Sequence, residues 1–193
     1  MNKSRAIALA TLALLLAGCA PLWVFTHYGP SAPGGKARGP FSGEWSGSPD
    51  TIQFVRNEVT IDVKAEEIGD ELSICVQLEV PRNREVRLRE PVVHVSLPSH
   101  PTGFRGTLNK YYPTDPTWRI DQVMKGETRE VRGIFGSRSH GKVYRLAARL
   151  IIPRSETVEV TPPEMDIDGQ PAGLPAILFK KQKSIQFYVP TGC

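Results

Sequence analysis

Apolar and polar residues alternate along most of this chain, and this alternation constrains its fold more than any other feature. Between residues 59 and 64, Val59, Ile61 and Val63 alternate with three polar residues. Because successive side chains of a β-strand point to opposite faces, this period of two predicts strands with one buried and one solvated face. The same period recurs in residues 72–80, 92–97, 131–135, 144–152 and 185–189.

Turn-forming residues separate these segments. The clearest signals are Ile68-Gly69-Asp70, residues 81–84 and the pair Asp168-Gly169, and residues 180–183 are interpreted as a further turn. Short strands joined by such turns predict an all-β, antiparallel β-sandwich, because the strands of a parallel sheet would be apolar on both faces. An immunoglobulin-like strand order is the first expectation and a transthyretin-like order the second.

The first residues have a different pattern. Lys3 and Arg5 precede an uninterrupted run of apolar or small residues from 6 to 16. A helix over this run would extend about 16 Å, too short for a hydrocarbon core of about 30 Å, so the segment is typical of a signal peptide. Its end, Leu16-Ala17-Gly18-Cys19, resembles the lipobox of bacterial lipoproteins.

This resemblance implies a cellular location and a lipid anchor. In bacterial lipoproteins the cysteine receives a diacylglycerol and the bond before it is cut, so Cys19 would become the lipid-modified first residue, with the membrane as its partner. Ala20 stands where an Asp would tend to retain such a protein at the inner membrane. We therefore expect a protein of the outer membrane that faces the periplasm.

Three parts of the chain follow from this interpretation. Residues 1–18 would be the signal peptide, 19–49 the lipidated N-terminus with a flexible tether, and 50–193 a single sandwich domain. Proline and glycine are concentrated between residues 29 and 40. About 30 flexible residues would give a root-mean-square reach of roughly 30 Å. Trp23 and Phe25 would either lie at the lipid headgroups or pack on the domain.

Two cysteines remain besides the anchor, Cys75 and Cys193, in a compartment where disulfides persist. Cys75 shares the polar face of its predicted strand with Ser73 and Gln77. A bridge to Cys193 would require the C-terminal tail to cross the outer face of that strand, and would stabilise the fold by about 4 to 5 kcal/mol. The alternative is two unpaired thiols.

Arginine is concentrated between residues 82 and 90, where Arg84, Arg87 and Arg89 are candidates for an anionic-ligand patch. If they share a face, they could bind lipid phosphates or an anionic glycan through bidentate contacts. The alternative is that they solvate the sheet and protect an edge, since Glu85 and Glu90 neutralise part of the run.

Aromatic residues form a second candidate, a partner patch at one end of the sandwich: Phe104, Tyr111, Tyr112 and Trp118. Tyrosine and tryptophan give large contact area at low entropic cost, which favours a docking surface. The alternative is that these residues close the end of the core.

No catalytic or metal-binding motif is evident. The four histidines are scattered without a second ligand at a metal spacing, so we expect no metal site: His27, His94, His100 and His140. No phosphate-binding loop or cofactor motif is present either. Removing residues 1–18 lowers the net charge from +4 to about +2. A nucleic-acid partner is therefore not expected.

These observations favour a non-enzymatic function. We expect a binding or structural accessory protein of the cell envelope, with an envelope protein or glycan as its partner. The alternative is a small periplasmic hydrolase that uses a loop-borne serine or histidine.

Overall fold

The computed structural model describes residues 22–39, 49–111, 119–121, 123–127, 129–133 and 136–187. Every regular element in these residues is a β-strand. The chain divides into two compact units: His27–Gln182, and Met1–Thr26 together with Lys183–Cys193. Strands β1 and β17 each continue from one unit into the other.

Seventeen strands are present in the described part of the chain: β1 (Leu22–Ser31), β2 (Lys36–Arg38), β3 (Thr51–Arg56), β4 (Val59–Ile68), β5 (Glu71–Val80), β6 (Glu85–Leu88), β7 (Val92–Leu97), β8 (His100–Thr107), β9 (Asn109–Lys110), β10 (Met124–Lys125), β11 (Arg129–Gly133), β12 (Gly136–His140), β13 (Lys142–Ile151), β14 (Thr157–Thr161), β15 (Met165–Ile167), β16 (Gln170–Pro171) and β17 (Ile177–Phe187). They form a five-stranded sheet, β1-β17-β14-β7-β8, and a six-stranded sheet, β2-β3-β4-β5-β13-β9. A third sheet has the order β10-β6-β15-β16, and β11 and β12 form a separate hairpin.

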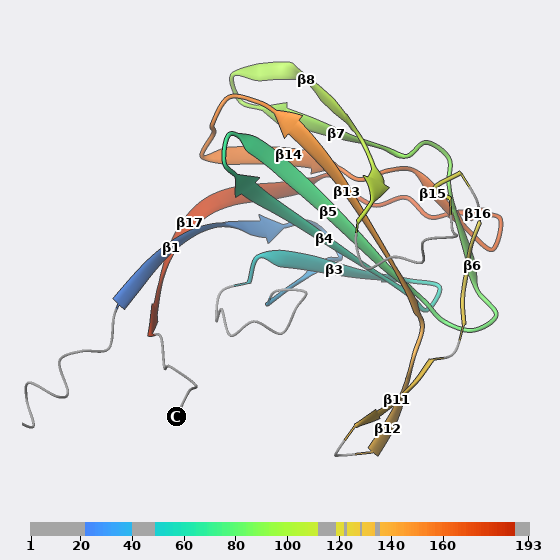
Figure 1. The fold of residues 1–193 in the computed structure, drawn as a ribbon. Helices are drawn as coiled ribbons and strands as arrows, with labels where there is room; N and C mark the ends of the chain where they lie inside the picture. Colours follow the sequence, from blue (N-terminus) through green and yellow to red (C-terminus); the bar gives the residue numbers. More distant parts are fainter. Residues whose placement is uncertain are drawn as a thin grey trace, which may run out of the picture. The chain divides into compact units, whose positions relative to one another are not determined.

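The core lies between the two large sheets (Figure 1). From the six-stranded sheet, Ile61 and Val63 stand opposite Leu78 and Val76, and none of the four side chains is more than 1% exposed. The facing layer of β7, β14 and β17 buries its own alternate residues, among them Val95 and Phe179. Each fully buried side chain of this size contributes about 1.5 to 3 kcal/mol. The prediction of an all-β antiparallel sandwich is confirmed.

The strand order differs from the immunoglobulin-like expectation. In an immunoglobulin sandwich at most three strands that are consecutive in sequence lie side by side in one sheet, namely C, C′ and C″ of the variable type. Here four consecutive strands, β2 to β5, form a meander, with pairs such as Ile52–Val63 and Val63–Val76 in direct register. Alternation predicts that strands have an inner face, but it contains no information about which strands become neighbours.

The Pro/Gly-rich N-terminal segment is part of the fold, which corrects the expected tether over residues 22–39. Tyr28 in β1 is only 3% exposed and belongs to the core. Pro30 is tolerated because β1 lies at the edge of its sheet. Pro33 and Gly34, with a Gly34 φ of 68°, form a type II turn closed by the Gly35 N–H to Ala32 O hydrogen bond. This turn carries the chain from the five-stranded to the six-stranded sheet.

The compact body therefore begins at His27 and not at residue 50. At the opposite edge the chain crosses between sheets again, from β8 to β9, through Leu108. Leu108 is 1% exposed and donates its N–H to Pro91 O at 2.8 Å. The signal-peptide residues, Cys19 and residues 40–48 lie outside the described residues.

Most predicted turns are confirmed. Gly69 (φ 65°) and the pair Asp168 and Gly169 (φ 51° and 76°) each occupy a two-residue hairpin connection. The turn expected at residues 180–183 is wrong, because β17 runs through it. Lys180 pairs with Thr157 of β14, and the Lys181 N–H donates to Glu156 O.

Candidate functional site: the two ends of strand β4

At one end of β4, Arg84 lies between two carboxylates. Its Nε and Nη2 donate to Glu58 Oε2 at 3.0 and 2.9 Å, and its Nη1 donates to Asp168 Oδ2 at 2.8 Å. The backbone N–H of Glu85 donates to the other Asp168 oxygen at 3.0 Å. Glu58, Arg84 and Asp168, here called the Arg84 cluster, therefore join the β3–β4 turn, the β5–β6 turn and the β15–β16 turn.

Strained backbone surrounds this arginine. Glu58, Asn83 and Asp168 have φ values of 67°, 65° and 51°. Asn and Asp tolerate the left-handed region, whereas other non-glycine residues lose about 1 to 2 kcal/mol there. Glu58 occupies the second position of a type I′ turn, where glycine is favoured. The strained residue is thus the one whose carboxylate accepts two of the three side-chain hydrogen bonds of Arg84.

An open hollow of about 640 Å³ lies beside the cluster, lined by Asn83, Arg84, Glu85, Lys125, Gly126 and Asp168. The side chains of Glu85 and Lys125 are exposed and form no ion pair with any residue the structure describes. The Glu85 N–H and, less strongly, Arg84 lower the pKa of Asp168, although its partial burial opposes this. The hollow therefore offers charged donors and acceptors of both signs, and none of the residues that line it has a hydrophobic side chain.

The opposite end of β4 carries a second cluster, formed by Tyr28, Glu67 and Lys181. The Tyr28 hydroxyl lies 2.9 Å from Glu67 Oε1 and 2.8 Å from Ser155 O, so one proton is shared between two acceptors. Lys181 Nζ donates to the same Glu67 oxygen at 2.9 Å and lies 5.6 Å from the centre of the Tyr28 ring. We call this group the Tyr28 cluster.

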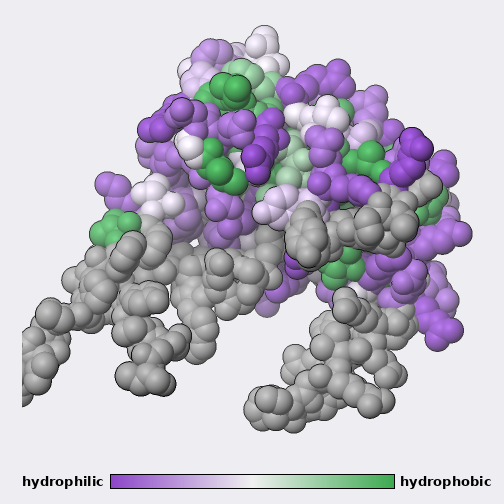
Figure 2. Space-filling view, in the orientation of Figure 1, coloured by the Kyte–Doolittle hydropathy of each residue, from purple (hydrophilic) through white to green (hydrophobic). Residues whose placement is uncertain are grey.

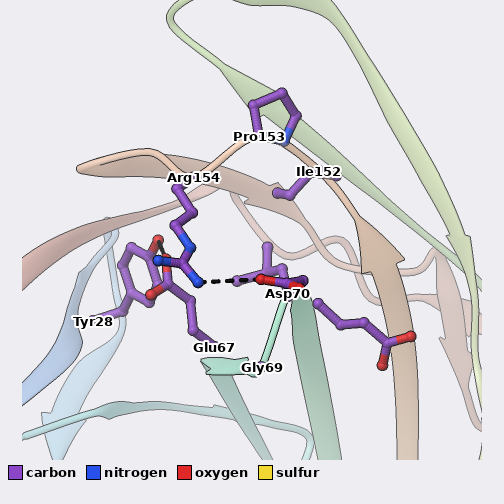
Figure 3. A pocket seen from close by; sticks show the side chains of 9 residues that line it. Tyr28, Glu67, Gly69, Asp70, Ile152, Pro153 and Arg154 are labelled. Carbon is purple, nitrogen blue, oxygen red and sulfur yellow. Dashed lines mark hydrogen bonds and ion pairs between the residues drawn. The ribbon is translucent and has the colours of Figure 1, made fainter.

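This end is closed. The cavity beside the Tyr28 cluster holds about 10 Å³, which is at most the space of one water molecule. Figure 3 shows Arg154 reaching over Tyr28 and Glu67 to pair with Asp70, at 3.1 Å. Burial raises the pKa of Tyr28, and the hydrogen bond to Glu67 and the charge of Glu67 raise it further. Burial also acts to raise the pKa of Glu67, but hydrogen bonds from Lys181 and Tyr28 outweigh it and lower the pKa.

Between the two ends, the outer face of the six-stranded sheet carries a buried acid. Asp62 is 4% exposed, accepts a hydrogen bond from Gln53 Nε2 at 2.9 Å and lies 3.9 Å from Arg38. Burial raises the pKa of Asp62, with Arg38 and Gln53 acting against it. The network joins β2, β3 and β4, so its role is to hold these three strands together.

Cys75 lies on this outer face, as predicted from its strand pattern. It stands opposite Lys64 and Ala147, and its Sγ is 3.7 Å from Ser73 Oγ. Burial raises the pKa of the Cys75 thiol. Cys193 lies outside the described residues, so the disulfide stays a prediction.

The predicted arginine patch is largely paired with acids. Arg89 bonds Asp166 at 2.8 Å and lies 3.8 Å from Glu164, and Arg84 is held as described above. Arg87 is exposed and forms no salt bridge with another described residue. The structure does not present three free guanidinium groups on one surface, so an anionic ligand would meet Arg87 and Lys125 before the others.

The predicted aromatic patch is placed only in part. Phe104 of β8 is half-buried against the core, with its ring centre 5.8 Å from that of His100. Tyr111 is 48% exposed. Tyr112 and Trp118 lie outside the described residues. Figure 2 shows polar residues over most of the visible described surface, with hydrophobic residues in separate small patches.

The histidines do not assemble into a metal centre in the described ranges, where no group of three or more His, Cys, Asp or Glu side chains is close enough to hold an ion. Ser99 Oγ lies 2.9 Å from His100 Nδ1 in the exposed turn between β7 and β8. Among the residues that the structure describes, this is the one contact between a serine hydroxyl and a histidine ring, the pair that a serine hydrolase uses.

Comparison with protein-family models, with curated proteins and with solved structures finds no match to this chain. Within residues 22–187, as far as these are described, no helix has the length and apolar character needed to cross a bilayer. Any functional assignment therefore depends on the residues themselves.

Both clusters contain residues that the sequence did not single out. Glu58 follows Asn57 in a turn without glycine, so it carries no recognisable turn signal. Tyr28, Glu67 and Lys181 are far apart in sequence and meet only because interior positions of β1 and β17 lie beside the end of β4. The Asp168-Gly169 turn was recognisable, but its link to Arg84 was not.

Proposed function

We propose that this chain is a lipid-anchored protein of the cell envelope, attached at Cys19, whose sandwich is a non-enzymatic binding or structural module. The proposal combines the lipobox-like segment with the geometry of the Arg84 end. In this proposal the protein lies at the outer membrane and faces the periplasm, and its partner is an envelope protein or glycan.

The observation that carries the binding role is the strained Glu58 beside an open polar hollow. Strained residues persist where the surrounding structure over-determines them, and they cluster at functional sites. Glu58 keeps its left-handed conformation while its carboxylate orients Arg84 at the rim of the hollow. The Tyr28 end has a comparable set of charges but no space for a ligand.

Connectivity supports this choice of end. The anchor at Cys19 would reach the compact body through His27 and Tyr28, at the closed end of β4. The Arg84 cluster lies at the other end of this ten-residue strand, about 30 Å away. The open end is therefore the end of the sandwich that the anchor does not enter.

Site-specific photocrosslinking in cells tests the proposal. A photoreactive residue replacing Lys125 or Glu85 should capture a discrete partner, whereas one replacing Glu159 or Thr161, which are exposed on β14, should not. Equal capture from both surfaces, or none from the hollow, would contradict the assignment. Cys19→Ser should also abolish palmitate labelling while the domain remains folded.

A hydrolase is the second candidate, and the Ser99–His100 contact is the observation that favours it. A generic ester and peptide panel would decide between the two. Hydrolysis that is lost in both Ser99→Ala and His100→Ala would replace the binding role with an enzymatic one.

A further inference from the structure

We propose that the terminal arm, formed by residues 22–26 of β1 and 183–187 of β17, is a membrane-contacting element that lies at the lipid–water interface. This inference rests on the proposed lipidation of Cys19. It adds a second contact with the bilayer, made by the polypeptide itself, to the one made by the lipid.

The arm is distinct from the sandwich body. Strands β1 and β17 are neighbours in the five-stranded sheet, and their outer ends both belong to the unit Met1–Thr26 with Lys183–Cys193, not to the unit His27–Gln182. Ser31 Oγ donates to Leu178 O, whereas Gly29 lies against the Gln182 side chain, so β17 runs antiparallel to β1. The start of β1 and the end of β17 therefore belong to the same end of the pair.

The composition of the arm is unusual for a solvated strand pair. Six of its ten residues are apolar or aromatic: Leu22, Trp23, Val24, Phe25, Ile185 and Phe187. Val24 is 63% exposed; of the other described side chains in the arm, Thr26 and Lys183 are exposed and Ser184 is half-buried. Tryptophan and phenylalanine with a flanking lysine are typical of segments at membrane interfaces, where apolar rings meet the headgroups.

Chain length identifies the bilayer as the partner of this surface. Leu22 follows Cys19 by three residues, and three extended residues span at most about 10 Å. Diacylglycerol on Cys19 would therefore hold the first residue of β1 within about 10 Å of the glycerol level of the lipid. No comparable constraint brings another protein to the arm.

Tryptophan fluorescence of the processed, lipidated protein in phosphatidylethanolamine–phosphatidylglycerol vesicles tests this proposal. The chain has three tryptophans, so Trp45→Phe/Trp118→Phe retains only Trp23, and Trp23→Phe/Trp45→Phe retains only Trp118. Lipids brominated on their acyl chains should lower the Trp23 emission about twofold, as expected for an interfacial ring. The Trp118 emission should fall less, because the proposal places only the arm at the bilayer.

A matched pair of variants checks whether the arm itself makes the contact. Val24→Asp in the Trp23-only protein should remove most of the quenching, whereas Val55→Asp, at a residue 56% exposed on β3, should leave it unchanged. A lipidated protein whose Trp23 is not quenched, or whose two tryptophans are quenched equally, would overturn the inference. A protein whose intact mass shows no lipid would instead refute the anchor, and the arm proposal with it.

Discussion

The two ends of β4 carry similar charged groups, but the cluster at one end is buried and the cluster at the other end is exposed. At the closed end, Tyr28 and Lys181 share one carboxylate, and Tyr28 is 3% exposed. At the open end, Arg84 is held by two carboxylates, its side chain is 34% exposed, and the turn that supplies Glu58 is strained. Burial makes the first cluster part of the stability of the fold. Exposure and strain at the second indicate a role other than stability.

The largest expected effect on stability comes from removing the Tyr28 side chain at the closed end. Tyr28→Ala removes a buried aromatic ring, so the free energy of unfolding should fall by about 3 to 5 kcal/mol. Urea denaturation at neutral pH measures this loss. Tyr28→Phe is the matched control, because it keeps the ring and loses only the hydroxyl hydrogen bonds, at a cost of about 1 kcal/mol. Equal losses in the two variants would mean that the hydroxyl, and not packing, determines the stability of this end.

The same hydroxyl should make stability depend on alkaline pH. The pKa of Tyr28 is raised in the folded state from an ordinary value of 10.0, so the folded state retains a proton that the unfolded state releases. Its contribution is therefore complete below pH 10 and is lost as the pH rises above 10. Thermal unfolding between pH 9 and 11 should show a steeper decline for the wild type than for Tyr28→Phe. Parallel declines would argue against this linkage.

At the open end, relief of strain should produce a gain. Glu58→Gly places glycine in the left-handed position of the β3–β4 turn and should raise the free energy of unfolding by about 1 kcal/mol. Asn57→Gly, in the same turn, is the control and should gain less, because asparagine tolerates this region. A loss of stability in Glu58→Gly would show that its pairing with Arg84 outweighs the strain. Capture of the partner at Lys125 should decrease in Glu58→Gly even though the protein is more stable.

The smallest global effect is expected for Arg84→Met. Exposed ion pairs contribute little to stability, so the melting temperature should stay within error of that of the wild type. The effect should be local: hydrogen exchange at the Glu85 and Asp168 amides should become faster, because these amides join the two turns that Arg84 bridges. If hydrogen exchange at both amides stayed as slow in Arg84→Met as in the wild type, the two turns would hold together without Arg84.

Alternation was sufficient to predict the fold class, since an inner face with a period of two is a property of each strand by itself. It predicted the buried positions of β4 and β5 and the polar face that carries Cys75. It could not predict neighbours, because β13 pairs with β5 over ten residues only after the chain between them has folded. The immunoglobulin-like order was therefore a guess about long-range pairing.

The N-terminal segment shows a different limit. Proline and glycine indicate a break in regular structure, but both a flexible tether and a tight turn between two sheets contain them. Pro33 and Gly34 form the turn, and the burial of Tyr28 makes the preceding residues a strand. For the Arg84 cluster, the arginine and the Asp168-Gly169 turn were both visible in the sequence. Their contact was not, because they are 84 residues apart.

The attachment of the chain to a membrane at Cys19 is the central claim, and the intact mass of the protein purified from the membrane fraction of a cell that expresses the full chain tests it most directly. We predict a mature chain that begins at Cys19 and carries a diacylglycerol, with fragment ions that place the added mass on the first residue. A chain that retains residues 1–18, begins at another residue or carries an unmodified Cys19 would contradict the account.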